Sequence, residues 1–382
     1  MDIGSFVDTE LDGFPGRRAG SHRFDGPGGT LVHAAVADAV ARYLGGELVA
    51  NDHGGFPASD FSDAIVSWTT ERVRALLGAV RGQVVFGPNM TGLTTVFVRA
   101  LGLGAGDEVI ITELDHEANR APWQALAAQG VVVREAPLGP SGVLPAEAVT
   151  GLLTERTKWV AVTAASNALG TVPDVASISR AAHAVGARVF VDGVQAVAHL
   201  PIDVAALGCD AFVTAAYKWY GTHAGILWVA DGDGLHLPEQ VPSAERAGPG
   251  HLQLGTLNFE AILGAGVAAD VLLRCDRAAI ATREDELRAS VRARLGELPG
   301  IRLLGPAGGT ALVTFQLDGV PAAKVAAHLA SRSVSVWHGT FYAVTAMRAV
   351  TTGDPDAVRA GISCYTTGAD VDALVAAVAE LT

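Results

Sequence analysis

Lysine is almost missing from this chain. Only three of its 382 residues are lysines. Lys158 follows the charged run Glu155–Thr157, and Lys324 lies on the polar side of a predicted helix, so both look like ordinary surface residues. Lys218 instead lies in the mostly apolar and aromatic stretch Ala215–Gly221. Because removing an ammonium group from water is costly, a lysine in such a place is expected to have a function.

Cysteine is equally scarce. Cys209, Cys275 and Cys364 are scattered, and no C-x-x-C pair occurs. An odd number of cysteines at these spacings argues against a disulfide framework. Cys364 falls on or just beyond a predicted strand, where we expect a buried, small hydrophobic side chain.

Three further absences exclude whole classes of protein. No uncharged apolar run is long enough to span a bilayer, and the N-terminus Met1–Phe6 lacks the basic and apolar regions of a signal peptide. The formal net charge of −13 argues against nucleic acid or an anionic membrane as the main partner. With 49% hydrophobic and 18% charged residues, we expect a globular, cytoplasmic protein.

Strands and helices alternate between about residues 60 and 230. This alternation predicts an α/β fold in which helices cover a mostly parallel, seven-stranded sheet. The expected strands lie at residues 84–86, 108–112, 131–136, 159–164, 188–192, 210–216 and 225–230.

The last third of the chain has a different pattern. One long helical stretch is expected at about Phe259–Leu298. Further strands are expected near residues 301–304, 311–317, 334–337 and 357–363, with helices at 321–331 and 370–381. We therefore predict a large α/β domain at residues 25–258 and a smaller α+β domain made of residues 1–24 and 259–382.

An acid and an amine follow two neighbouring strands. Val189–Gly193 reads as a buried strand that ends in the carboxylate of Asp192, and the strand at 210–216 leads to Lys218. Ligands bind at such carboxyl ends in α/β sheets. Pyridoxal phosphate needs this pair, a lysine for its aldehyde and an aspartate for its pyridinium nitrogen. The alternative is a helix-capping Asp192 and a Lys218 that reaches solvent.

A possible phosphate site lies in Phe86–Gly92, between a strand and a helix. Backbone amides at a helix N-terminus bind phosphate, and the Thr91 hydroxyl can assist. A plain strand–helix turn with Thr91 as its N-cap would look similar. The segment is not a Walker loop, because no Gly-Lys-Ser/Thr follows.

Four more polar side chains occupy informative positions. His116 can stack on a cofactor ring or shuttle protons, or merely cap a helix. Asn167 can bind a ring hydroxyl or a substrate carboxylate, or form a turn. Gln195 can reach a phenolic oxygen or face solvent. Arg359, in an apolar strand, suits bidentate binding of a carboxylate, or reaches water from an edge strand.

Together these segments resemble the class V aminotransferase family of fold type I, within it the cysteine desulfurase and selenocysteine lyase branch. The resemblance runs from about Phe24 to the C-terminus. The opening Phe24–Thr30 and the run Phe86–Thr91 resemble a desulfurase-like subfamily. The segments that carry the family resemblance are Asp115–Trp123, Ser166–Thr171, Val191–Ala196, Tyr217–Gly221 and Gly255–Asn258.

The resemblance implies a cofactor, pyridoxal 5'-phosphate, and a role for each residue around it. Lys218 would hold the cofactor as a Schiff base and move the α-proton of the substrate. Asp192 would pair with the pyridinium nitrogen, His116 would stack on the ring, and Gln195 would contact the phenolic oxygen.

It implies further roles for substrate and phosphate binding. Asn167 and Arg359 would hold the substrate carboxylate, and the loop at Met90 and Thr91 would bind the phosphate. Thr256 would reach the phosphate of the neighbouring subunit, in a homodimer with shared active sites.

The sequence departs from the family pattern at the substrate loop. Desulfurases carry there a cysteine that receives the substrate sulfur as a persulfide. In the corresponding segment Val334–Ala343, Tyr342 takes that position. Persulfide chemistry of the usual kind is therefore not expected. Tyr342 and His338 are predicted to contact the substrate, either as acids near the leaving group or as part of the pocket wall.

It also departs from the pattern in the phosphate pocket. Ala215 replaces a hydroxyl residue, and Tyr217 replaces the histidine before the lysine. The hydroxyl of Thr214 or of Tyr217 is expected to compensate.

The expected function is a pyridoxal phosphate enzyme that cleaves a carbon–sulfur bond in a cysteine-like amino acid by way of an α-carbanion. An aminotransferase or amino-acid epimerase on the same scaffold is the alternative. A nucleotide-binding dehydrogenase is disfavoured, because the glycine-rich run Gly102–Gly106 follows a helix rather than a strand. The intact pair of Lys218 and Asp192 argues against a catalytically silent binding protein. No metal is expected.

Overall fold

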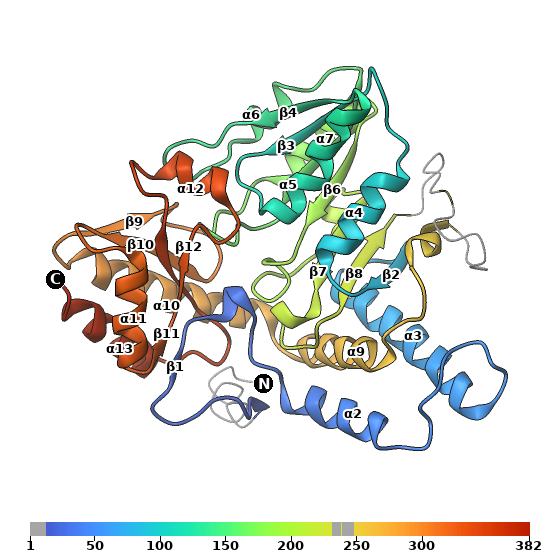
Figure 1. Cartoon of the computed structure of the whole chain (residues 1–382), viewed down its shortest axis with the longest axis horizontal. Helices are drawn as coiled ribbons and strands as arrows, with labels where there is room; N and C mark the ends of the chain where they lie inside the picture. Colours follow the sequence, from blue (N-terminus) through green and yellow to red (C-terminus); the bar gives the residue numbers. More distant parts are fainter. Residues whose placement is uncertain (1–12, 231–237, 239–247) are drawn as a thin grey trace.

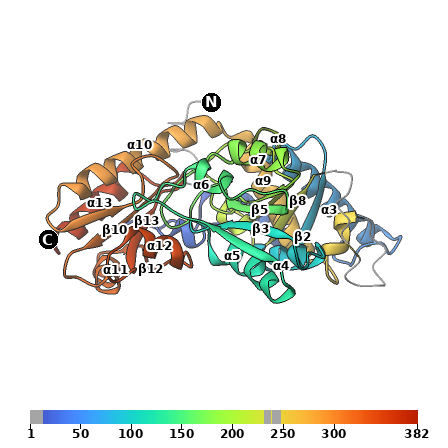
Figure 2. The same ribbon diagram turned by 90° about the horizontal axis from the view of Figure 1, so that it is seen from above.

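The computed structural model describes residues 13–230, 238 and 248–382. The predictions for Met1–Phe6, and the first twelve residues of the predicted small domain, lie outside this part. The described residues build three sheets, of seven, four and two strands, and the two larger sheets lie in separate regions of the molecule (Figures 1 and 2).

The larger sheet confirms the predicted seven strands and mostly parallel order. Its β8 is antiparallel to both neighbours, β2 and β7, and the other neighbouring pairs are parallel. Across the sheet the order is β2 (Gln83–Gly87), β8 (Gly225–Val229), β7 (Ala211–Ala215), β6 (Arg188–Asp192), β5 (Thr157–Thr163), β3 (Glu108–Thr112) and β4 (Val132–Ala136).

Helices cover both faces of this sheet, which is why inner strands such as β7 and β8 are buried along their whole length. On β3, Val109 and Ile111 share a core with α4 (Met90–Ala100) and α5 (Glu117–Gln124). Ile110 points the other way, into a core shared with other helices. These are α2 (Ala34–Leu44), α3 (Pro57–Leu76), α7 (Val175–Ala184) and α9 (Phe259–Arg274).

The smaller sheet is antiparallel and has its own core. Its order is β12 (Trp337–Gly339), β13 (Ala357–Gly361), β10 (Leu312–Leu317) and β9 (Ile301–Leu304). Buried side chains such as Phe315 pack against α10 (Arg277–Gly296), α11 (Ala322–Ser331) and α13 (Gly368–Ala379). Figure 2 shows α10 extending along this part of the molecule.

The long helical stretch predicted at about Phe259–Leu298 is divided into two helices, α9 and α10. Cys275 has an extended backbone, and the Asp276 carboxylate accepts a hydrogen bond of 3.0 Å from the Ala279 N–H, so a new helix starts there. α9 packs with α2 and α3 against the large sheet, whereas α10 packs against the small one. The sequence placed both in the small domain, and the exact domain boundary remains a prediction.

The remaining elements are short. α2 and α12 were not among the predicted helices, and the strand predicted at 334–337 is divided into β11 and β12. Among the described helices, none has both the length and the apolar character of a membrane span. The short elements are β1 (His22–Arg23), β11 (Val334–Ser335), α6 (Ala146–Thr150), α8 (Val204–Leu207), α12 (Val344–Val350), η2 (Gly26–Gly28), η3 (Ala125–Gln129), η4 (Ala216–Lys218) and η5 (Gly248–Leu252).

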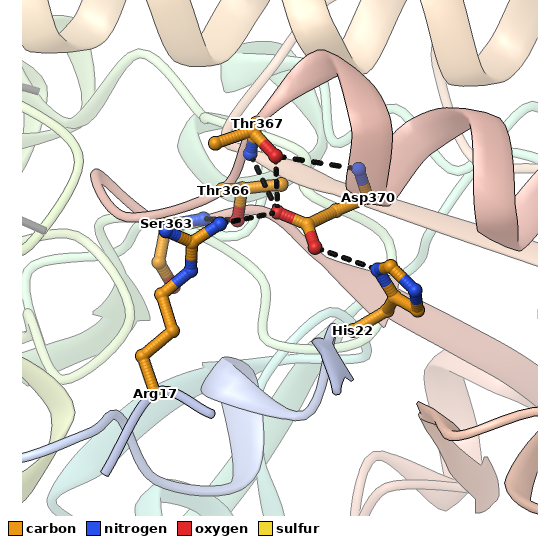
Figure 3. Close-up of polar contacts among 6 residues, drawn as sticks. All are labelled: Arg17, His22, Ser363, Thr366, Thr367 and Asp370. Atoms are coloured by element: carbon orange, nitrogen blue, oxygen red, sulfur yellow. Dashed lines mark hydrogen bonds and ion pairs between the residues drawn. The ribbon is translucent and has the colours of Figure 1, made fainter. Parts of the chain in front are cut away.

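The segment before α2 is fastened to the small sheet region by a polar cluster (Figure 3). Asp370, in the first turn of α13, forms a capping box with Thr367. The same carboxylate binds His22 Nδ1 at 2.8 Å and Arg17 Nη2 at 3.4 Å. These contacts tie residues 17–22 to the start of α13, and β1 pairs with β11 beside them.

This fastening carries the next residues to the junction of the two sheets. The Gly361 N–H donates to the Phe24 carbonyl at 2.7 Å, and a Cβ on Gly361 would collide with the Pro27 ring. A glycine is therefore required at this close approach. As a result, the Pro27 carbonyl accepts a hydrogen bond from Lys218 Nζ.

Candidate active site

The carboxyl ends of the large sheet and the first turns of two helices surround one cavity, which we call the inner cavity. It contains most of the side chains that the sequence singled out. The predicted residues that line it are Met90, Thr91, His116, Asn167, Asp192, Gln195, Tyr217 and Lys218.

Lys218 follows β7 in the short helix η4. Its Nζ lies 5.1 Å from the centroid of the Tyr217 ring and donates to the Pro27 carbonyl. Burial and the nearby Arg359 charge lower its pKa to about 7, although Asp192 acts in the opposite direction. An amine with such a pKa is substantially neutral near pH 7, and a neutral amine can attack an aldehyde.

Asp192 is the last residue of β6 and is only 4% exposed. Its Oδ1 accepts a hydrogen bond of 2.9 Å from the Val194 N–H. Burial raises its pKa to about 6, against the effects of this hydrogen bond and of Lys218. A desolvated carboxylate of this kind gains from a cation placed beside it in the cavity.

His116 is held in one orientation. It is the N-cap of α5, and its Nδ1 accepts a hydrogen bond of 2.9 Å from the Ala118 N–H. Burial, followed by the charges of Lys218 and Arg359, lowers its pKa to about 4. The ring is therefore neutral near pH 7, with its proton on Nε2, and presents a flat surface to the cavity.

Asp115, just before His116, is a buried acid that sequence reasoning gave no role. Its carboxyl accepts from the Thr112 hydroxyl at 2.5 Å and from Asn119 Nδ2 at 2.8 Å. Burial raises its pKa to about 7. Its only signal in the sequence was its place beside His116.

The helix α4 provides an anion-binding end. Asn89, and not Thr91, is its N-cap, since the Asn89 Oδ1 accepts from the Gly92 N–H at 2.8 Å. Met90 and Thr91 form the first turn, whose backbone N–H groups lack partners inside a helix. A Cβ on Gly225 of β8 would collide with the Asn89 backbone, so that glycine lets the loop pass over the sheet.

Of the two hydroxyls expected to compensate in the phosphate pocket, only Tyr217 lines the cavity. Its ring stacks on His223, with centroids 4.8 Å apart and planes at 8°. The Thr214 hydroxyl is buried and accepts a hydrogen bond of 3.1 Å from the Trp219 indole.

Asn167 lines the inner cavity, and Arg359, which does not line it, contacts Asn167. Arg359 Nη1 donates to the Asn167 carbonyl at 2.6 Å, and Asn167 Nδ2 donates to the Phe341 carbonyl at 2.8 Å. Arg359 is 3% exposed, and burial lowers its pKa to about 9. The Asn167 Oδ1 and the Arg359 Nε are buried without a hydrogen-bond partner, so both can bind a ligand.

His338 and Tyr342 line a second, larger cavity of about 980 Å³, which we call the outer cavity. Lys218, His116, Asn167 and Tyr217 line both cavities. Tyr342 is 74% exposed, and its ring centroid lies 5.6 Å from that of His116.

Sequence reasoning missed two aromatic neighbours of Tyr342. Trp337 lines the outer cavity, and the Phe341 ring centroid lies 4.4 Å from the Arg359 guanidinium carbon. Phe341 and Tyr342 both have left-handed backbones, with φ of 57° and 55°. No residue type in this segment signals such a turn, because non-glycine residues rarely adopt it.

Thr256 is not brought to the inner cavity of its own chain. It is exposed and lines a separate hollow together with His223. Its predicted contact with the phosphate of a neighbouring subunit remains a prediction.

All three cysteines lie within the described residues, and none lines either cavity. Cys209 and Cys364 are buried, as expected for Cys364, and burial raises the pKa of both thiols. The Cys275 Sγ contacts the Val271 carbonyl at 3.1 Å, inside its own helical turn.

The inner cavity fits pyridoxal 5'-phosphate. It combines the amine of Lys218, the buried carboxylate of Asp192, the flat ring of His116 and an anion-binding helix end. These groups match an aldehyde, a pyridine nitrogen, an aromatic ring and a phosphate. The unpartnered Nε–H of Arg359 leaves a donor for a substrate carboxylate.

Comparisons with known proteins agree with this fit. The family described as Aminotransferase class-V matches residues 22–374. A cysteine desulfurase of Klebsiella pneumoniae is 35% identical over 289 residues, covering 72% of this chain and 71% of that protein. One from Escherichia coli is 34% identical over 290 residues, covering 71% and 70%.

Solved structures show the same architecture. The cysteine desulfurase CsdA from Escherichia coli aligns with a TM-score of 0.87 and 25% identity, over 100% of this chain and 98% of that one. A cysteine desulfurase from Thermococcus onnurineus, at 24% identity and a TM-score of 0.86, shows the fold alone. The chain belongs to the class-V aminotransferase family and uses pyridoxal 5'-phosphate as its cofactor.

Proposed function

We propose that this protein cleaves the carbon–sulfur bond of a cysteine-like amino acid with pyridoxal 5'-phosphate. The observation that carries the proposal is the shared lining of the inner cavity by the Lys218 amine and the Asp192 carboxyl, with Arg359 beside Lys218 in the lining of the outer cavity. The relatives named cysteine desulfurases support a sulfur-containing substrate.

Each residue of the inner cavity then has a task. Lys218 binds the cofactor aldehyde and moves the proton at the substrate Cα. Asp192 holds positive charge at the pyridine nitrogen, and neutral His116 lies against the ring. When bound, the cofactor supplies an electron sink for the negative charge at Cα.

Substrate and phosphate are held at opposite ends. Arg359 donates to the substrate carboxylate through its free Nε–H, and Asn167 donates through the second N–H of its Nδ2. Met90 and Thr91 bind the phosphate through the start of α4, and Tyr217 adds its hydroxyl in place of a histidine.

Two further assignments belong to the proposal. Gln195, buried in the same cavity, reaches the phenolic oxygen. Thr256 completes the phosphate site of a second copy in a cytoplasmic homodimer.

The fate of the sulfur differs from that in a desulfurase with a loop cysteine. Tyr342 takes the loop position, and neither cavity contains a thiol. We infer that the sulfur leaves the active site without being stored on the protein. An aminotransferase or an epimerase would use the same inner cavity, and their products distinguish them.

Product analysis tests the proposal. Cysteine derivatives should yield pyruvate, ammonium and a thiol or sulfide without an added keto acid. A reaction that needs a keto acid, or that only inverts Cα, would replace carbon–sulfur cleavage with one of the alternatives.

The absorption spectrum tests the cofactor site. The purified protein should show the visible band of bound cofactor, and Lys218→Ala should abolish it together with activity. Lys324→Ala is the matched control, since Lys324 is exposed on α11 far along the chain. A wild-type protein that stays colourless with added pyridoxal phosphate would contradict the assignment of Lys218.

A further inference from the structure

The outer cavity is much larger than a cysteine side chain requires. Its volume of about 980 Å³ is near the upper end of the range for pockets that enclose drug-sized ligands. It begins at Lys218 and Arg359, where the groups around the substrate Cα are bound, and extends away from the inner cavity. A substrate side chain that leaves Cα therefore enters a wide space.

One wall of this space consists of small side chains. Ala118, Ala121, Pro122 and Ala125 line it from α5 and the start of η3. Their spacing of three and four residues puts the alanines on one helix face. Ala121 and Ala125 are exposed, so the space in front of them is open.

A second part of the lining is aromatic. Trp337 is 48% exposed and Tyr342 is 74% exposed, and both line the cavity with Phe341. Exposed aromatic surface that gathers at one hollow marks a binding site for an apolar group.

The aromatic wall is fixed in place. The Trp337 Nε1 donates to the Asp25 carbonyl at 3.0 Å, and a Cβ on Gly28 would collide with the indole. The Tyr342 carbonyl accepts from the Glu117 N–H at 2.7 Å. The aromatic lining is therefore held in place before any substrate arrives, which lowers the entropy cost of binding.

We propose that the outer cavity binds a bulky apolar group on the substrate sulfur, so that the preferred substrate is an S-substituted cysteine rather than cysteine itself. The inference rests on the proposed function and adds its substrate class. It also explains a loop without a cysteine, since a thioether sulfur leaves as an intact thiol.

The reaction balances without an oxidant or reductant. The substrate Cα loses a proton, the Cβ–S bond breaks, and the sulfur leaves with the bonding electron pair and takes up a proton. Water then hydrolyses the three-carbon enamine. One thioether and one water give one thiol, one pyruvate and one ammonium ion.

A series of substrates tests the proposal: cysteine, S-methylcysteine, S-butylcysteine and S-benzylcysteine. Each methylene that the cavity buries should raise kcat/KM about fourfold. S-benzylcysteine should therefore exceed cysteine by at least about tenfold. If cysteine is the best substrate, this inference fails while carbon–sulfur cleavage stands. If no member of the series is cleaved, the proposed function fails as well.

A substitution that fills part of the outer cavity gives a second, independent test. Ala121→Leu should raise KM for S-benzylcysteine about tenfold and leave kcat/KM for cysteine within about twofold. Ala127→Leu is the matched control, because Ala127 is an exposed alanine of η3 that does not line the cavity. This control should leave KM and kcat/KM unchanged for both substrates.

The same variants test whether a second copy of the chain occupies the cavity instead. In that case Ala121→Leu would weaken self-association in sedimentation experiments, and S-benzylcysteine would gain nothing over cysteine. That pair of results would overturn the proposal.

Discussion

The inner and outer cavities share a boundary but are built from opposite materials. The inner cavity is lined by buried polar groups, and burial moves the pKa of Lys218 to about 7, of His116 to about 4 and of Asp192 to about 6. The outer cavity is walled by exposed alanines and by the exposed rings of Trp337 and Tyr342.

The two cavities also differ in the elements that hold their lining residues in place. Asp192 and Lys218 follow strands that have cores packed on both faces, so the fold fixes their positions. The outer walls are one helix face and the segment 337–342. A change of substrate therefore requires only surface substitutions, whereas a change of cofactor chemistry would require rebuilding the sheet. The inner cavity should set what bond chemistry is possible, and the outer cavity should set which amino acid is used.

The largest expected effect comes from the inner cavity. Asp192→Asn keeps the shape of the side chain and removes the charge that stabilises a protonated ring nitrogen. We expect kcat to fall by about 10²–10³-fold, the scale for losing one electrostatic contact in a buried site. If the inner cavity alone sets the bond chemistry, steady-state kinetics should show the same fall in kcat for cysteine and for S-benzylcysteine. Asp318→Asn, at an exposed position, is the control, and a loss confined to one substrate would break the separation of the cavities.

The second-largest effect is expected for Arg359→Lys. Lysine keeps the charge but loses the planar fork that binds a carboxylate with two hydrogen bonds. We expect KM to rise about tenfold to hundredfold for every amino acid, since hydrogen bonds to charged groups contribute about 1.5–3 kcal/mol.

Arg359 also donates to the Asn167 carbonyl, so denaturant unfolding should accompany the kinetics. Arg348→Lys, at an exposed position of α12, is the control. An unchanged KM in a fully folded Arg359→Lys protein would assign the substrate carboxylate to other residues.

The sequence predicted the inner cavity well and the outer cavity poorly, for a physical reason. Mostly apolar, buried strands are easily recognised, and the polar residues at their carboxyl ends meet at one edge of a parallel sheet. This is why Asp192, Asn167 and Lys218 could be placed together in advance.

The outer wall depends on contacts between residues far apart in the sequence. Trp337 is held by Asp25 and Gly28, and Phe341 reaches Arg359 through a left-handed turn. None of these contacts has a periodicity, so the sequence predicted only Tyr342 and His338 there.

Local competition explains why the start of α4 and the break between α9 and α10 were not predicted. Asn89 and Thr91 are both good N-cap residues, and only the backbone decides between them. The apolar spacing continues across Cys275 and Asp276. The end of α9 could therefore not be predicted from the sequence, although Asp276 caps α10.

A smaller effect, about tenfold, should appear in the pH dependence of cofactor binding. Burial and Arg359 lower the Lys218 pKa from 10.5 to about 7, with Asp192 opposing. The neutral amine, which reacts with the aldehyde, therefore increases as pH rises and predominates above about pH 7.

Protein stripped of cofactor should thus bind pyridoxal phosphate about tenfold faster at pH 8 than at pH 6, with a plateau above pH 8. Stopped-flow absorbance measures the rate. Ala121→Leu should leave the profile unchanged, because it alters only the outer cavity. A rate that still rises tenfold between pH 8 and pH 9 would show an unshifted lysine.

The smallest effect decides what Tyr342 does. Its ring packs 5.6 Å from the His116 ring, and its backbone carbonyl is bound by the Glu117 N–H. Tyr342→Phe keeps the ring, the left-handed turn and both contacts, and removes only the hydroxyl.

If Tyr342 is part of the wall, kcat/KM for S-benzylcysteine should stay within about threefold of wild type at every pH. If the hydroxyl acts as an acid toward the leaving sulfur, kcat should instead fall by about 10²-fold or more, and most for thiols that leave least readily. The first result keeps proton transfer inside the inner cavity. The second result would make the outer cavity part of the catalytic machinery. Bond chemistry and the choice of substrate would then no longer belong to separate cavities.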